Sequence, residues 1–398
     1  MAEPLAQRDS PAVFPRAIFL ACSWTWVIGM FFPVYLVAEF GAMGWVAFAV
    51  PNVLGSIAMG LEARRVREGF ESEHGRAMRA FSLVTICFHV AFLSWFLAVC
   101  ASKNQMVKQG YVGPIIALVL FTIAWGLARL GMKQLRTAAI GAFVLSLLCG
   151  MMAWRTSDTI NLPPRFGPRP IGDLGAALPI LALGFFRCPW LDLSYWRVRR
   201  ETPGRAGDLA FILGFSVFFL AMIALTLLYA GAMAKGSYSL YILVHIAIQS
   251  VFTIAVHLRC RADSRAMFNP NNRDNARPVP LDWSLVFVVA LGLCFGPIDW
   301  LPEYRPGYRP TRMAYELFMS FYALVFPAYA WIVMRHWNLP SRTRTRTWLF
   351  TTGLATPMLW MGYIEKHSLW LLPTVGIVLL APLIARAVTP RSDPPFAA

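Results

Sequence analysis

Long hydrophobic stretches run through the whole 398-residue chain and constrain its fold more than any other feature. A helix needs about 20 mostly apolar residues to cross a membrane. Only 14% of the residues are charged, against about 25% in a typical soluble domain. The sequence therefore predicts an all-α integral membrane protein with about 12 transmembrane helices, at 17–38, 43–62, 80–101, 112–130, 138–154, 175–197, 207–232, 239–258, 283–300, 312–334, 346–363 and 369–387. The fifth stretch is short and Gly296-Pro297 interrupts the ninth, so the count ranges from ten to twelve.

Basic residues are distributed unevenly between the two sets of predicted loops. Of the 36 Lys and Arg residues, 25 lie on the side of the two termini and ten on the other side, while Arg187 lies within the sixth stretch. Cytoplasmic loops carry the excess of Lys and Arg. We therefore expect a protein of the plasma (inner) membrane, embedded in the lipid bilayer, with both termini in the cytoplasm. The net charge of +16 follows from this bias, and no stretch interleaves basic with stacking aromatic residues, so the sequence indicates no nucleic-acid partner.

The cysteines and the loops suggest no resident cofactor. Seven cysteines are an odd number, most of them lie in apolar stretches, and no CxxC pair occurs. This pattern favours neither a disulfide framework nor a zinc site or other metal site. No loop carries GxxxxGK[ST], so the sequence gives no support for transport driven by ATP. The ions to consider are Na⁺ or H⁺, as coupling ions rather than cofactors.

Two of the predicted helices contain a glycine and a proline close together. Gly29 and Pro33 interrupt the first, and Gly184 and Pro189 interrupt the sixth, about 155 residues later. Proline removes a backbone donor, and a broken helix is tolerated in a membrane only where it faces protein or a water-filled cavity. The repetition predicts two discontinuous helices, one and six, that face a single binding site. Two ordinary proline kinks are the alternative.

The position of the breaks predicts an inverted repeat. If helices one to five form a unit of 17–154, helix six starts a second unit, 175–334, from the opposite side of the membrane, because five is odd. Inverted repeats with broken helices are typical of secondary transporters. The remaining parts are then a cytoplasmic N-terminal tail (1–16), two additional transmembrane helices (346–387) and a cytoplasmic C-terminal tail (388–398).

Side chains at the two breaks are the candidate solute-binding residues. Arg187 is suited to an anionic group of a solute or to pairing with Asp192, and Asp192 to a cation, to the solute or to a salt bridge with the cytoplasmic arginines. The aromatic residues either line a pocket or pack within the bundle, and Trp26 offers a cation–π contact. The predicted solute-binding set is Trp24, Trp26, Gly29, Phe31, Phe32, Arg187 and Asp192.

Polar residues in other predicted helices are candidates for ion coupling. In the eighth, Gln249, Ser250 and Thr253 either bond neighbouring helices or provide oxygens for sodium, together with carbonyl groups of helix one near Ile28. The predicted ion-binding set is Ile28, Ser250 and Thr253. His89, His245 and Glu316 are either hydrogen-bonded structural residues or members of a proton relay.

Two segments resemble a known transporter superfamily. Trp24–Gly60, with the core Gly29-Met30-Phe31-Phe32-Pro33 and with Pro51-Asn52, resembles the first two core helices of the amino acid–polyamine–organocation superfamily. Pro189–Arg197 is similar to the end of the second broken helix of sodium:solute symporters, although Gln249-Ser250 stands where those proteins have an adjacent hydroxyl pair. The resemblance implies the five-plus-five inverted-repeat fold of the bacterial leucine transporter. It also implies a secondary transporter that moves a small polar or amphipathic solute by alternating access, coupled to sodium or protons.

Two other function classes remain alternatives. An integral membrane enzyme that acts on lipid-linked substrates needs an acidic or His/Asp cluster at the membrane surface, and the loop Asn271-Asn272-Arg273-Asp274 is the nearest candidate. A non-transporting sensor or scaffold could keep the transporter fold. Between these classes the sequence favours a transporter and not an enzyme.

Overall fold

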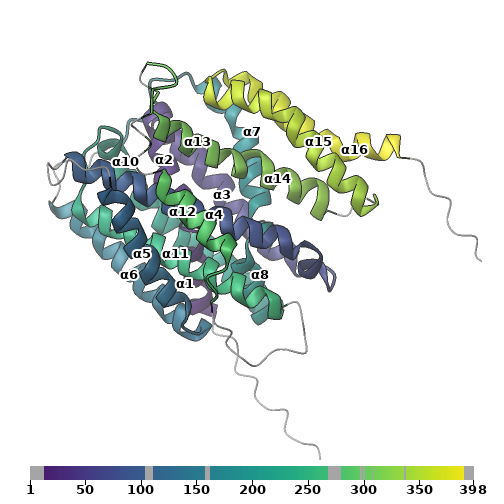
Figure 1. Cartoon of the computed structure of the whole chain (residues 1–398), viewed down its shortest axis with the longest axis horizontal. Coiled ribbons are helices and arrows are strands. Elements are labelled where there is room, and N and C mark those ends of the chain that lie inside the picture. Colours follow the sequence, from purple (N-terminus) through teal and green to yellow (C-terminus); the bar gives the residue numbers. More distant parts are fainter. Residues whose placement is uncertain are drawn as a thin grey trace, which may run out of the picture.

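The computed structural model describes residues 13–103, 111–156, 162–267, 279–295, 298, 301–306, 308–335 and 338–389. These residues form a bundle of packed helices (Figure 1), and an isolated bridge between Arg305 and Tyr308 is their only β-type pairing. The helices are α1 (Val13–Trp24), α2 (Val27–Phe40), α3 (Ala42–Ala63), α4 (Phe70–Lys103), α5 (Val112–Ala128), α6 (Met132–Thr156), α7 (Ile171–Arg187), η1 (Cys188–Leu191), α8 (Leu193–Glu201), α9 (Gly204–Leu213), η2 (Gly214–Phe219), α10 (Leu220–Ala234), α11 (Leu240–Met267), α12 (Trp283–Cys294), α13 (Pro310–Ser320), η4 (Phe321–Val325), α14 (Phe326–Tyr329), η5 (Ala330–Met334), α15 (Ser341–Leu359), η6 (Trp360–Ile364), η7 (Ser368–Trp370) and α16 (Leu371–Val388).

The predicted membrane helices are present, with changed boundaries. Within the described ranges, eight helices are long and apolar enough to cross a membrane, and the bent pair α1–α2 makes a ninth span. The other three predicted spans correspond to the shorter apolar helices α5 and α12 and to α15–η6, whose first turns carry arginines. Gly296-Pro297 and the loop at 271–274 lie outside the described residues.

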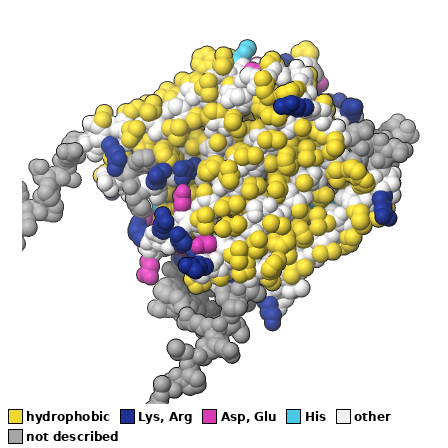
Figure 2. Space-filling model, turned by 180° about the vertical axis from the view of Figure 1, so that it is seen from behind, with side chains coloured by type: hydrophobic (Ala, Val, Ile, Leu, Met, Phe, Trp, Pro, Cys, Tyr) yellow, Lys and Arg dark blue, Asp and Glu magenta, His cyan; other side chains and the backbone are white. Residues whose placement is uncertain are grey.

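A broad hydrophobic surface surrounds the bundle. Figure 2 shows one face on which hydrophobic side chains cover the centre, while the Lys and Arg side chains lie toward the edges. Large apolar side chains such as Val119, Phe350 and Leu380 are more than half exposed. A soluble monomer rarely exposes so much contiguous apolar surface, whereas a membrane protein presents it to lipid. The chain is therefore an integral membrane protein.

The first transmembrane helix is discontinuous, but the break does not lie at Gly29 and Pro33 as predicted. Helices α1 and α2 meet at an angle of 56° across Thr25 and Trp26, and both Gly29 and Pro33 lie inside α2. Trp26 has an extended backbone, and its indole N–H donates to the carbonyl of Ser23 at 2.6 Å. Side-chain groups thus form hydrogen bonds with the backbone around the break. Such bonds compete with the hydrogen bonds of a continuous helix. Pro33 still leaves the Gly29 carbonyl without its helical donor.

The second discontinuity lies where the sequence predicted it. The α-helical part ends at Arg187, the 3₁₀ turn η1 contains Pro189, and the extended residue Asp192 starts α8. The Asp192 carboxylate accepts the backbone N–H of Ser194 at 2.7 Å and so caps α8. The two predicted discontinuous helices are therefore confirmed.

The last two helices do not stand apart from the rest of the bundle. Helices α15 and α16 run along one flank of the bundle (Figure 1) and pack against α7 and the η4–η5 segment. The turn that joins them, around Lys366, has a positive φ of 67° at that residue. This turn reaches the central cavity described below, so 346–387 is part of the wall of the site.

Candidate solute site between the broken helices

A cavity of about 120 Å³ lies between the two broken helices. Helices α2 and α7 form two of its walls, and the rest comes from α3, the α13–η4 segment and the α15–α16 hairpin. Of the predicted solute-binding residues, the cavity is lined by Trp24, Trp26, Gly29 and Phe32. Ile28, predicted to contribute to ion binding, also lines it.

Two tryptophans and an asparagine form one end of the cavity, which we call the floor. The rings of Trp24 and Trp26 lie 4.3 Å apart between centroids. The Trp24 indole donates to Asn52 Oδ1 at 2.7 Å. Because an indole N–H is only a donor, this bond fixes the orientation of the Asn52 amide. Its Nδ2 group donates to none of the described residues, although Asn52 is only 2% exposed. The floor therefore presents one free amide donor beside aromatic faces.

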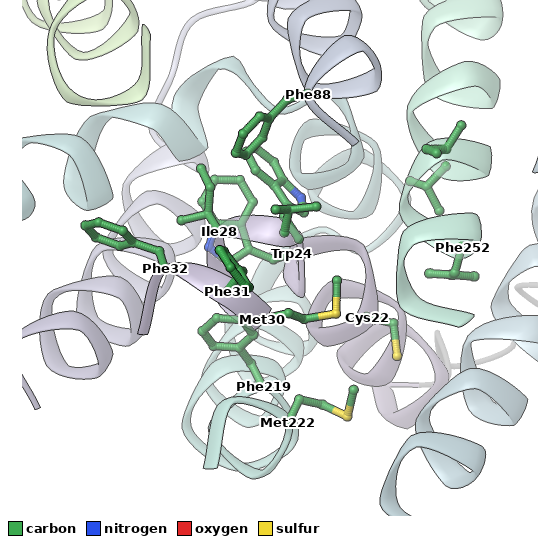
Figure 3. Close-up of a cluster of buried hydrophobic side chains, with 14 of the residues drawn as sticks. Cys22, Trp24, Ile28, Met30, Phe31, Phe32, Phe88, Phe219, Met222 and Phe252 are labelled. Carbon is green, nitrogen blue, oxygen red and sulfur yellow. The ribbon is translucent and has the colours of Figure 1, made fainter. Parts of the chain in front are cut away.

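The middle of the cavity is apolar and closely packed. Phe32, Phe185 and Tyr322 line it, and the Tyr322 hydroxyl is bonded to Thr85 at 3.0 Å. Figure 3 shows that Phe31 and Phe32 leave α2 in different directions. Phe31 does not line the cavity. Its ring instead packs in an aromatic cluster with Tyr35, Phe92, Trp95, Phe96 and Tyr315.

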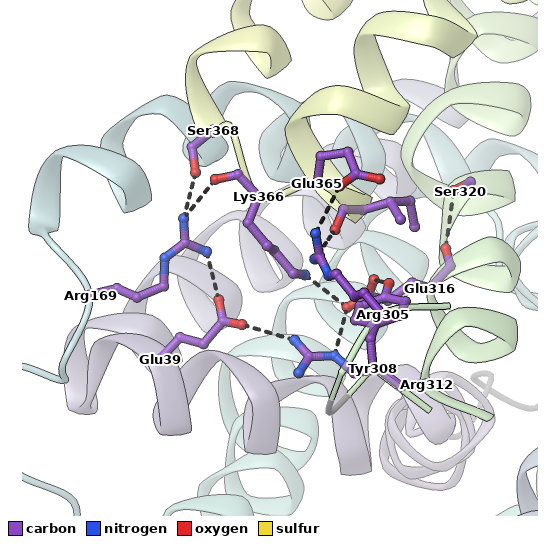
Figure 4. A network of polar contacts seen from close by, with 11 residues as sticks. Glu39, Arg169, Arg305, Tyr308, Arg312, Glu316, Ser320, Glu365, Lys366 and Ser368 are labelled. Atoms are coloured by element: carbon purple, nitrogen blue, oxygen red, sulfur yellow. Dashed lines mark hydrogen bonds and ion pairs between the residues drawn. The ribbon is translucent and has the colours of Figure 1, made fainter. Parts of the chain in front are cut away.

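Ion pairs cross the other end of the cavity, which we call the ionic lid (Glu39, Arg169, Arg312, Glu316 and Lys366; Figure 4). Glu39 binds Arg169 at 3.1 Å and Arg312 at 3.4 Å. Glu316 binds Arg312 at 3.2 Å and Lys366 at 2.8 Å, and it also accepts from the Tyr308 hydroxyl. The lid thus joins the end of α2, the loop before α7, the start of α13 and the α15–α16 turn.

The lid separates the cavity from a more open pocket. This outer pocket has a volume of about 330 Å³ and shares Glu39, Arg169 and Lys366 with the cavity. At its rim Arg305 binds Glu365 at 2.8 Å, and the hydrogen bond from Tyr304 lowers the pKa of the Glu365 carboxyl. A solute that enters the cavity from this pocket must pass the ionic lid.

The far end of the bundle is closed by a second set of ion pairs. We call it the basic end, because it holds the arginines that follow α3 and those of α8 and α11. Four of these pairs connect α8 with α4, α6, α9 and α11, one joins the end of α3 to α9, and two lie within α8 or α11. The seven pairs are Arg200–Glu71, Arg199–Asp208, Arg64–Asp208, Arg136–Glu201, Arg197–Glu201, Arg197–Asp263 and Arg259–Asp263.

Arg187 and Asp192 do not meet each other, nor do they line the cavity. The Arg187 guanidinium lies over the ring of Trp331 at 4.8 Å. Asp192 is fully buried and caps α8 through Oδ1, and its Oδ2 atom has no partner among the described residues. No salt bridge joins either residue to the other in the described structure.

The predicted ion ligands lie in two places. Thr253 on α11 donates to the Cys22 carbonyl in the last turn of α1, at 3.5 Å. Ser250 Oγ is buried without a partner among the described residues, and Gln249 bonds Ser146 on α6 at 2.9 Å. Ile28 lies beyond the break, on the cavity. The structure therefore brings α1 and α11 together, and of the three predicted ion ligands only Ile28 lines the cavity.

The three predicted relay residues have different surroundings. His89 accepts the N–H of Val27, the first residue of α2, at 3.4 Å and bonds the Thr85 carbonyl through Nδ1 at 2.7 Å. Neither ring nitrogen of His245 has a partner in the described part of the chain. Glu316 belongs to the ionic lid and is only 4% exposed. His89 thus supports the break in helix one, and Glu316 lies at the entrance to the cavity.

We expect His89→Leu to lower the thermal stability of the purified protein, because the first N–H of α2 loses its buried acceptor. Leaving a buried polar group unsatisfied costs about 1–3 kcal/mol. His245→Leu is the matched control. It removes an equally buried imidazole that has no partner among the described residues, and it should leave the melting temperature unchanged or raise it. Equal losses in the two variants would show that the contact of His89 with Val27 does not support the break.

Several residues of the site were not predicted from the sequence. Asn52 is recognisable in the sequence because it is an amide within an apolar stretch. It was noted only as part of the segment that resembles a transporter helix, and not as a site residue. Glu39, Arg169 and Lys366 lie in short loops or at helix ends, where charged residues are common. These residues come close together because the α15–α16 hairpin packs on α7. No local sequence pattern predicts that packing.

Comparison with known proteins gives a match in structure only. No protein-family model matches the sequence, and no curated protein does so either. The fold is similar to that of Mhp1, a nucleobase-cation-symport-1 family transporter solved in a closed conformation with bromovinylhydantoin bound. The similarity covers 94% of this chain and 92% of the other, with a TM-score of 0.50 and 12% sequence identity. At this identity the match shows only that the two chains share a helical fold.

Proposed function

We propose that this chain is a secondary transporter that moves a small solute by alternating access, coupled to a gradient of sodium or protons. The observation that carries the proposal is the cavity between two interrupted helices, with ion pairs across its outer end and a second set of ion pairs at the far end of the bundle. Transporters of this kind bind their solute near the middle of the membrane at the interface of two inverted repeats. Here the repeats are 17–154 and 175–334.

The basic end is the cytoplasmic end in this proposal. Its arginines belong to the loops that hold most of the positive charge. The ionic lid and the outer pocket then face the other side of the inner membrane. Among the described residues, five ion pairs join different helices at the cytoplasmic side, and the ionic lid closes the outer side.

The lining of the cavity indicates the class of solute. Aromatic rings surround the floor, Asn52 offers one donor, and the charged lid residues are paired with each other. An ion entering the inner part would find no free counter-charge among the lining residues, and burying an unpaired charge is costly. We therefore infer a neutral, flat solute with a carbonyl acceptor, stacked near Trp24 and Trp26. The hydantoin bound in Mhp1 has this chemistry.

Bromovinylhydantoin is the solute with which to test the proposal. In proteoliposomes we expect saturable uptake driven by a sodium or proton gradient, and in detergent a saturable change of tryptophan fluorescence. Asn52→Leu should weaken binding about tenfold or more, because the acceptor of the solute and the Trp24 indole both lose their partner. Gln134→Leu changes an exposed amide on α6 and is the matched control.

Two results would contradict the proposal. Binding that is unaffected by Asn52→Leu would place the solute outside this cavity. Binding without gradient-driven uptake in sealed vesicles would favour a sensor with the transporter fold.

A further inference from the structure

A buried polar group lies between the cavity floor and the basic end. It centres on Asp192, which is 0% exposed and whose Oδ1 accepts the N–H of Ser194 at 2.7 Å. The second carboxylate oxygen, Oδ2, has no hydrogen-bond partner among the described residues. His257 is also buried, and its Nε2 atom is likewise without a partner. Two titratable groups with unsatisfied atoms therefore lie in the interior of the bundle.

This group is connected to the floor of the cavity. Ser194 follows Asp192 in α8 and donates to Ser23 Oγ at 3.2 Å. The carbonyl of Ser23 accepts the Trp26 indole N–H at 2.6 Å. His257 contacts the same tryptophan ring, with 5.4 Å between centroids. If solute binding moves Trp26, these contacts therefore transmit the movement to α8 through Ser23 and to α11 through His257.

The unpaired oxygen has an energetic consequence. An ionised carboxylate in a membrane interior costs at least about 2.5–3.5 kcal/mol, and such residues almost always pair or serve an ion pathway. The guanidinium groups of α8 are engaged elsewhere, since Arg197 binds Glu201 and Asp263 and Arg199 binds Asp208. Asp192 thus has no counter-ion among the described residues, and its Oδ1 atom is bonded to the start of α8 at the second break.

The neighbouring groups favour a proton over a metal cation. A hard cation needs several oxygen ligands, but the nearby hydroxyl groups are already bonded. Tyr195 donates to Ser56 at 3.0 Å, and Ser23 donates to the Leu20 carbonyl at 3.1 Å. A proton requires only the free Oδ2 atom.

We propose that Asp192 is a proton-binding site that couples solute binding at Trp26 to a proton gradient. The proposal rests on the transport function proposed above and assigns its coupling ion. Oδ2 takes up one proton from the solution and forms an O–H bond, which neutralises the carboxylate. Release of the same proton, after the broken helices have moved, restores the carboxylate.

Other titratable groups lie near Asp192 on the elements packed around it. Tyr195 on α8, Cys260 on α11 and Tyr322 on η4 interact electrostatically with its carboxylate, while α1 and α3 contribute the hydroxyl groups of Ser23 and Ser56. His257 on α11 and His89 on α4 interact with each other. His257 is the main alternative carrier of a proton, so the test includes it.

The test compares wild type with Asp192→Asn and His257→Asn, using bromovinylhydantoin and pH values from 5.5 to 8. Asparagine is also a good helix N-cap, so the start of α8 should persist. For wild type we expect the Kd to rise with pH by up to tenfold per unit, with uptake of up to one proton on binding. Asp192→Asn should bind with a Kd that does not vary with pH. Asp208→Asn, an aspartate fully paired with Arg64 and Arg199, is the control and should keep the pH dependence.

Other results would overturn the proposal. If Asp192→Asn keeps the pH dependence and His257→Asn loses it, the histidine is the proton site. If sodium at pH 8 stabilises wild type but not Asp192→Asn, the residue is a sodium ligand.

A measurement without solute tests the role of Asp192 independently of the inferred solute class. If bromovinylhydantoin binds at no pH, the inferred solute class is wrong. Thermal unfolding across the same pH range then shows whether Asp192 binds a proton. Because the charged form is buried with an unpaired oxygen, wild type should lose stability relative to Asp192→Asn as the pH rises. Parallel curves for the two proteins would contradict a titrating Asp192.

Discussion

Replacing Gly55 by leucine is expected to abolish the folded protein. A Cβ atom at Gly55 would lie 2.2 Å from the carbonyl oxygen of Phe185 and 2.9 Å from the Cα atom of Phe186. Both are backbone atoms, so no change of rotamer relieves the contact, and α3 would have to move away from α7. Overpacking of this kind typically costs 1–3 kcal/mol or more. Because Phe185 also lines the cavity, the solute site would be disturbed with the fold.

Size-exclusion chromatography and thermal unfolding in detergent check this expectation. Gly55→Leu should give no monodisperse peak, and Gly55→Ala a reduced melting temperature. Gly141→Leu is the matched control, since a Cβ atom there has no neighbour within 4 Å. A Gly55→Leu protein with the elution profile and melting temperature of wild type would show that α3 and α7 do not approach so closely.

The architecture was largely predictable because membrane helices follow from simple physics. Each span needs a long apolar stretch, and every span predicted from the sequence corresponds to a helix in the structure. The second break was located from Pro189, since proline cannot continue a helix. The first break was misplaced by a few residues. Pro33 was accommodated inside α2, while the indole of Trp26 and the imidazole of His89 bonded the backbone one turn earlier.

The site was only partly predictable because it depends on which way side chains point. Phe31 and Phe32 are adjacent in sequence, yet only Phe32 reaches the cavity. In a helix that is apolar on all sides, hydrophobic periodicity does not distinguish these faces. The ionic lid needs Lys366 from the hairpin and Glu316 from α13, 50 residues apart, and their meeting is a result of tertiary packing alone.

Opening the ionic lid should expose the cavity to reagents from the outer pocket. Glu316 is buried and pairs with Arg312 and Lys366. Glu316→Gln removes the counter-charge of Lys366, and Lys366→Gln leaves Glu316 with only one cationic partner, Arg312, so each variant weakens the closed lid. A change of only 1.4 kcal/mol between closed and open lid shifts their ratio tenfold. We therefore expect Glu316→Gln and Lys366→Gln to raise the open population by at least tenfold.

Cys188 provides a reporter for this change, because its thiol is buried and lines the cavity. In a Cys294→Ser background, which removes the exposed thiol, a charged methanethiosulfonate reagent should modify Cys188 at least ten times faster in the lid variants. Glu365→Gln breaks the pair with Arg305 at the rim and should leave the rate unchanged. If the folded lid variants are labelled at the wild-type rate, these ion pairs do not control access of the reagent to the cavity. Faster labelling that bromovinylhydantoin suppresses would place the solute below the lid, on the same path as Cys188.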